Sequence, residues 1–193
     1  QYPSSAEKFF KADGSLYQLG DIWRQPDLAH TLELIRDQGR DGFYKGENAE
    51  RLATFMAEIG GVITPEDLLK YEAQEREPVR GTYRGYDIIS MPPPSSGGVA
   101  LVEMLNILEG FDLAAMGHNS ADYLHVLTES MRRAYADRAQ HLGDPDFSES
   151  MPLERLTDKS YAATLRASID LDKASPSSPE DFAQIYESED RTS

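Results

Sequence analysis

The protein has 193 residues, which is enough for one good-sized domain or for part of a larger one. A formal net charge of −15 argues against nucleic-acid binding, which needs a basic surface, and it also disfavours anionic membranes. The absence of cysteine excludes disulfides, a thiol nucleophile and zinc sites built on cysteine, and no apolar run is long enough to span a membrane.

The first part of the chain predicts a turn-rich start followed by helices. Residues 1–25 carry tight-turn signals, and the only tryptophan, Trp23, is expected to anchor packing. Apolar residues at helical spacing predict helices over residues 26–38, 47–59 and 65–71. The last of these has a clear start, because Thr64 is a good N-cap and Pro65 suits the first helical position.

Two β-like runs follow, Val79–Tyr83 and Tyr86–Met91. They are separated only by Arg84 and Gly85, so we expect them to pair as a short hairpin.

The stretch from Met91 to Gly110 organises the chain. Its three prolines hold the backbone extended, and the serines and glycines after them allow a sharp turn into an almost fully apolar helix. Such a helix is expected to be buried, with Gly110 at its end.

The turn itself has two interpretations. Backbone amides at a helix start attract anions, so four residues form a candidate anion nest: Ser95, Ser96, Gly97 and Gly98. Alternatively, these small residues permit close packing at a strand-to-helix turn. The pattern lacks the ending of a P-loop and is not a dinucleotide-binding fingerprint, and we favour the structural interpretation.

The rest of the chain predicts two more helices, over residues 121–142 and 157–169. The inner stripe of the first is expected to hold Leu124, Leu127, Met131, Tyr135, Arg138 and Leu142. With six helices and one hairpin, the fold class is α+β and mostly helical. Residues 1–169 are expected to form the helical part of a domain, and the acidic residues 170–193, rich in serine and proline, a flexible tail.

Three groups of polar residues are candidates for chemical sites. His125 and Glu129 are one helical turn apart and could present two ligands to a metal, but without an evident third ligand an exposed ion pair or helix-face hydrogen bond is favoured. Asp144, Asp146 and Glu149 do not have EF-hand spacing, so a turn is favoured over a calcium or acid–base site.

The third group is Asp137 and Arg138, which we interpret as part of a structural salt bridge. No serine, histidine and aspartate can be assigned to a triad. The residues therefore predict no catalytic, substrate-binding or metal-binding side chain and no cofactor.

Several motifs resemble the gamma-glutamyltranspeptidase family, in that family's order and over nearly the whole chain. They are Phe43-Tyr44-Lys45-Gly46, Tyr83-Arg84-Gly85-Tyr86, Pro-Pro-Pro-Ser-Ser-Gly-Gly at 92–98, Ala134-Tyr135-Ala136-Asp137-Arg138 and Leu142-Gly143-Asp144-Pro145-Asp146-Phe147.

The resemblance implies an αββα N-terminal-nucleophile hydrolase whose precursor cuts itself. The new N-terminal threonine of the small subunit then attacks a gamma-glutamyl carbonyl, with its own amine as base. In the family an acidic Tyr-Glu-Ser segment precedes the cut, so Tyr186-Glu187-Ser188 implies that this chain is the C-terminal part of the large subunit. Ser193 would then neighbour the processing site, although Asp190-Arg191-Thr192-Ser193 departs from the family's ending and puts the cleaved bond in doubt.

The complete enzyme implied by the resemblance transfers gamma-glutamyl groups from glutathione or similar compounds to water or amino acids. Its partner is the small subunit, which supplies most substrate-binding groups, and its location is the periplasm or the exterior. No family site residue can be matched onto this chain, which is expected to be inactive alone. The alternatives are a related acylase acting on cephalosporin-like amides and a non-enzymatic binding or interaction module.

Overall fold

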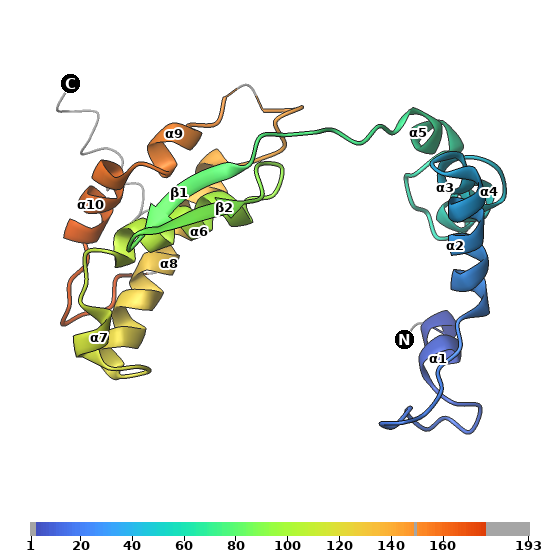
Figure 1. The fold of residues 1–193 in the computed structure, drawn as a ribbon, viewed down its shortest axis with the longest axis horizontal. Coiled ribbons are helices and arrows are strands. Elements are labelled where there is room, and N and C mark those ends of the chain that lie inside the picture. Colours follow the sequence, from blue (N-terminus) through green and yellow to red (C-terminus); the bar gives the residue numbers. More distant parts are fainter. Residues whose placement is uncertain (1–2, 149, 177–193) are drawn as a thin grey trace. The chain divides into compact units, whose positions relative to one another are not determined.

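The structure is a computed structural model that describes residues 3–148 and 150–176 (Figure 1). These residues group into two compact units, one ending at Gln74 and the other beginning at Glu75. The junction lies within residues 71–78, which form neither helix nor strand.

Apart from an isolated β-bridge between Phe10 and Leu16, the regular secondary structure described in the first unit is helical. Its helices are α1 (Pro3–Phe9), α2 (Pro26–Gln38), α3 (Asp41–Tyr44), α4 (Gly46–Glu58) and α5 (Pro65–Lys70). The predictions of α2, α4 and α5 are confirmed. Turns are present at residues 11–15 and 18–21, as expected of a turn-rich start, but α1 was not predicted; it begins at Pro3, a residue that suits the first turn of a helix.

Local signals account for the helix ends in this unit. Gly39 ends α2 with φ = 58°, a left-handed conformation that glycine adopts without strain. Thr64 and Asp67 form a capping box at α5, in which each side chain accepts a hydrogen bond from the other residue's backbone N–H. Trp23 packs against Phe9 with ring centroids 5.2 Å apart, as expected of a packing anchor.

The second unit consists of a hairpin and a group of helices. Its elements are β1 (Val79–Tyr83), β2 (Tyr86–Ser90), α6 (Gly97–Leu108), α7 (Leu113–Met116), α8 (Ala121–His141), α9 (Leu153–Leu156) and α10 (Lys159–Ala167). The strands are antiparallel, and both turn residues, Arg84 and Gly85, have positive φ, as a tight two-residue hairpin turn requires. The predicted hairpin is therefore confirmed.

Helix α6 is the centre of this unit, as its apolar sequence predicts. It contacts the hairpin, α8, α9 and α10, and both Val99 and Ile107 are completely buried. Figure 1 shows β1 and β2 lying along α6. The hairpin approaches closely at Gly81, where an added Cβ would lie 2.7 Å from a methyl group of Val102. A larger residue at Gly81 would push the hairpin away from the core.

The predicted inner stripe of α8 is only partly right. Leu142 packs against the core and Leu127 is half-buried, but Leu124, Met131 and Tyr135 are exposed. The buried residues of α8 lie mostly one position before the predicted ones: Val126, Glu129, Ser130, Arg133, Ala134 and Asp137. One residue is about 100° around a helix. The true inner face is polar, so a search for apolar periodicity selects the neighbouring stripe.

The helix expected over residues 157–169 is confirmed as α10, and α9, a single turn of helix before it, was not predicted. Asp158 lies between α9 and α10 and caps α10 by accepting hydrogen bonds from the N–H groups of Ser160 and Tyr161. In total, the described residues form ten helices rather than six, and the four additional ones, α1, α3, α7 and α9, are all short.

Candidate functional site

The turn before α6 is built for close packing. Gly98 is buried, and a Cβ added to it would lie 2.1 Å from the carbonyl oxygen of Met91. Only glycine fits there. Gly97 is exposed, and its N–H donates a hydrogen bond to Ser95 Oγ at 3.4 Å.

Ser96 is held by a side chain from α8. Arg138 Nε donates a hydrogen bond to Ser96 Oγ at 2.7 Å, across 42 residues of sequence. Arg138 was expected on the inner stripe of α8, but it is exposed and reaches the turn from the surface. The geometry of Gly98 agrees with the structural interpretation of the turn, and an anion-binding role for residues 95–98 stays a prediction.

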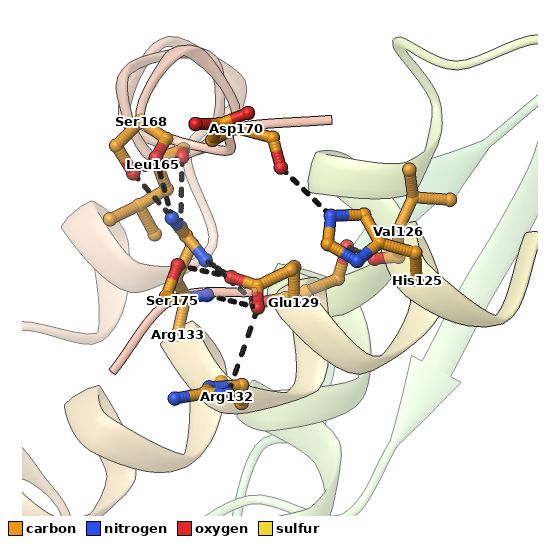
Figure 2. A network of polar contacts seen from close by, with 10 residues as sticks. His125, Val126, Glu129, Arg132, Arg133, Leu165, Ser168, Asp170 and Ser175 are labelled. Carbon is orange, nitrogen blue, oxygen red and sulfur yellow. Dashed lines mark hydrogen bonds and ion pairs between the residues drawn. The ribbon is translucent and has the colours of Figure 1, made fainter. Parts of the chain in front are cut away.

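A second polar centre joins α8 to the chain that follows α10. Figure 2 shows Arg133 pointing from α8 toward the C-terminal end of α10. Its guanidinium donates hydrogen bonds to the carbonyl oxygens of Leu165 and Ser168 at 3.1 and 2.8 Å, and to Ser168 Oγ at 2.9 Å. The Leu165 carbonyl also accepts hydrogen bonds from the N–H and the hydroxyl of Ser168, and the positive charge of Arg133 complements the negative end of the helix dipole.

Glu129 neutralises this buried arginine. Its Oε2 lies 2.7 Å from Arg133 Nη1, and both side chains are at most 2% exposed. Glu129 also accepts hydrogen bonds from the backbone N–H and the hydroxyl of Ser175. Burial raises the pKa of Glu129, but the hydrogen bonds from Ser175 and Arg133 outweigh it, so the pKa lies below the ordinary value.

A second residue of α8 also binds the segment that follows α10. His125 Nε2 donates a hydrogen bond to the carbonyl oxygen of Asp170 at 2.8 Å (Figure 2). His125 and Glu129 thus both bind the segment after α10 and do not converge on a common point. The expected exposed pairing of these residues is wrong, because Glu129 is buried and paired with Arg133. Within residues 3–148 and 150–176, no group of three or more histidine, aspartate or glutamate side chains could hold a metal.

The third polar centre is a pair of buried carboxyl groups. Glu103 of α6 and Asp137 of α8 are 1% and 0% exposed, and they share a hydrogen bond. The hydroxyl of Tyr161, from α10, donates to Asp137 at 2.8 Å. Burial and the neighbouring Asp137 raise the pKa of Glu103 far above its ordinary value, so Glu103 holds its proton at neutral pH.

The remaining candidate residues have structural roles or lie outside the described residues. Asp144 accepts a hydrogen bond from the N–H of Asp146, as the turn interpretation predicts, and Asp146 itself forms an ion pair with Arg76 at 3.0 Å, which was not predicted. Glu149 and Ser193 lie outside the described residues, as does the segment from 177 onward.

The described residues do not assemble a hydrolytic centre of the serine–histidine kind. Among them, the hydroxyls of Ser95 and Ser96 make their hydrogen bonds with Gly97 and Arg138, and not with a histidine. The chemistry open to these three centres is binding and positioning: they fix the turn before α6, the end of α10 and the contact between α6 and α8.

Sequence reasoning missed the central members of these centres, Arg133, Glu103 and Tyr161. A signal for one contact was present. Glu129 and Arg133 have the i, i+4 spacing of a helical ion pair, with the acid N-terminal to the base. The contacts of Tyr161 and Ser175 join segments far apart in sequence, and local pattern does not reveal them.

Comparison with known proteins gives a consistent result. The family model described as gamma-glutamyltranspeptidase matches residues 1–193. A glutathione hydrolase proenzyme of Escherichia coli strain K12 is 48% identical over 174 residues, which is 90% of this chain and 30% of that protein. An "Acylase ACY 1 proenzyme" of Pseudomonas sp. strain SE83 is 47% identical over 150 residues, 78% of this chain and 27% of that protein.

A solved structure is similar to this chain. The crystal structure of Helicobacter pylori gamma-glutamyltranspeptidase matches with a TM-score of 0.80 and 46% identity, covering 91% of this chain and 50% of that one. This similarity confirms the predicted fold class, a mostly helical segment of an N-terminal-nucleophile hydrolase with a short hairpin. The chain spans about 30% of the length of the E. coli relative.

Proposed function

Since the chain belongs to the gamma-glutamyltranspeptidase family, we propose that it is a large-subunit segment of an enzyme that transfers gamma-glutamyl groups to water or amino acids. The observation that carries the proposal is the 48% identity to a glutathione hydrolase proenzyme over 90% of this chain. Glutathione and related gamma-glutamyl compounds are the proposed substrates.

The proposal assigns the chemistry to a partner subunit from the same precursor. Amide attack needs a nucleophile, a base and donors for the oxyanion. The sequence has no cysteine, and the serines at the start of α6 contact a glycine and an arginine. By the family resemblance, the proposed nucleophile is the N-terminal threonine of the small subunit, freed by self-cleavage near Ser193.

In this arrangement the second unit serves as scaffold and contact surface. Large apolar side chains are exposed on the chain by itself, among them Tyr86 at 75% and Phe147 at 89%. Exposed apolar groups of this size favour cover by another subunit. The proposed location is the periplasm or the exterior, and no helix of the described ranges combines the length and apolarity that crossing a bilayer requires.

The first prediction concerns activity. The chain alone is expected to release no product from a chromogenic gamma-glutamyl anilide, whereas the full-length precursor is expected to divide into two subunits and turn over the substrate. Electrophoresis follows the division, and absorbance follows the product. Turnover by the chain alone, abolished by changing one of its own residues, would contradict the proposal.

Cephalosporin-type amides are a second candidate substrate class, because an acylase relative is 47% identical over 150 residues. The same precursor should therefore be assayed on a cephalosporin-type amide at equal concentration. Hydrolysis of that amide, without turnover of the gamma-glutamyl anilide, would assign the chain to an acylase instead.

A further inference from the structure

The buried carboxyl groups of Glu103 and Asp137 belong to no function described so far. They lie where α6, α8 and α10 meet, and each is inaccessible to solvent. Buried carboxylates are expected to be paired with cations or fully hydrogen bonded. Here two acids also contact one another.

The hydrogen bonds around the pair are unequal. Asp137 accepts from the hydroxyl of Tyr161, and its Oδ1 lies 3.8 Å from His141 Nε2. Glu103 Oε1, in contrast, has no hydrogen-bond partner among the described residues. Asp137 thus has the surroundings of an anion, and Glu103 has those of a neutral acid that donates its proton to Asp137.

Two nearby cationic side chains favour the loss of the proton from Glu103. The guanidinium of Arg155, from α9, lies 4.5 Å from the ring centre of Tyr161, and its positive charge favours the ionised forms of Glu103 and Tyr161. His141, one turn along α8 from Asp137, adds positive charge when it is protonated. Burial and the charge of Asp137 still dominate, and they hold the pKa of Glu103 high.

We propose that Glu103 and Asp137 hold one proton between them at neutral pH, and that losing this proton at alkaline pH loosens the packing of α6 against α8. Two adjacent buried anions repel each other, and the helices that carry them are pushed apart. Arg138 follows Asp137 on α8 and holds Ser96 at the start of α6, so the turn before α6 loosens with them.

The direction of the pH dependence follows from proton binding. Above the ordinary glutamate range, the unfolded chain has released the Glu103 proton and the native state still holds it. Native stability therefore falls as pH rises, until the native pKa is passed. For one linked proton, the equilibrium constant for opening rises about tenfold per pH unit.

The second prediction tests this proposal in the full-length protein by hydrogen exchange and mass spectrometry between pH 6 and 9. After correction for the intrinsic exchange rate, peptides from α6 and α8 are expected to open more readily as pH rises. Glu103→Gln, which resembles the protonated acid in shape, is expected to lower the slope of that rise by about one proton. Peptides from α4 in the first unit should be the same in both proteins.

Two further variants make the test specific. Glu154→Gln removes an exposed carboxyl group from α9 and is expected to leave the slope unchanged. Asp137→Asn removes the neighbouring anion and is expected to lower the slope, which provides an independent measurement if Glu103→Gln folds poorly. An equal rise in the parent, Glu103→Gln and Asp137→Asn would overturn the proposal, and it would do so whether or not the enzyme is active.

Discussion

Replacement of Arg133 with methionine is expected to lower the free energy of unfolding by about 3–5 kcal/mol, the cost of breaking a buried ion pair by removing one partner. The variant leaves the buried Glu129 with only the longer ion pair to Arg132, at 3.7 Å, and removes one donor from each of the Leu165 and Ser168 carbonyl groups. Urea unfolding followed by far-UV circular dichroism measures the loss.

The first unit provides a matched control for this variant. Asp41 and Lys45 form an ion pair with the same i, i+4 spacing and a similar distance, 2.9 Å, but both side chains are about half exposed. Lys45→Met is expected to cost only about 0.3–0.5 kcal/mol, because water screens the exposed pair. Equal losses in the two variants would mean that burial of the Glu129–Arg133 pair does not matter.

The pH dependence of this pair has the opposite sign to that of Glu103. The lowered pKa of Glu129 means that its contribution to stability is present above the ordinary range for glutamate. That contribution is lost as pH falls through the lowered pKa. Protonation of Glu129 therefore lowers the stability of the parent at acid pH, and this part of the loss should be absent in Glu129→Gln.

Gly98→Ala is expected to lower the free energy of unfolding by about 3 kcal/mol, the upper end of the usual range for overpacked positions. The added methyl group would lie 2.1 Å from the Met91 carbonyl oxygen, so the backbone must move. Urea unfolding measures the loss for this variant too.

The neighbouring glycine is the control. A Cβ on Gly97 meets only Ser95 Oγ, at 3.6 Å, which is an ordinary contact. Because alanine is also the better helix former, Gly97→Ala is expected to be neutral or to stabilise by up to about 1 kcal/mol. If Gly98→Ala instead unfolds like the parent and loses affinity for inorganic phosphate, the anion-nest interpretation is correct.

Most of the fold could be predicted because its signals are local. The cap at Thr64, the positive-φ turn at Arg84 and Gly85 and the apolar run of α6 each act within a few residues. The same reasoning did not predict α9, because a helix of four residues is too short to show apolar periodicity.

The polar centres were harder to predict because each depends on residues that are distant in sequence. Ser96 and Arg138 are 42 positions apart, and Glu129 and Ser175 are 46 apart. Hydrophobic periodicity also assumes that a buried face is apolar. On α8 that assumption fails at Glu129, Arg133 and Asp137, and the predicted face was rotated away from the true one.

The polar inner face of α8 limits which amino-acid substitutions this helix can accept. An apolar face accepts exchanges among leucine, isoleucine and methionine, since volume and shape are most of what it requires. Glu129, Arg133 and Asp137 instead need particular donors and acceptors on three other segments, so one change must be accompanied by a second elsewhere. In a library of random substitutions, α8 should therefore tolerate change at Leu124 and Met131, its exposed apolar positions, and resist it at its buried polar ones.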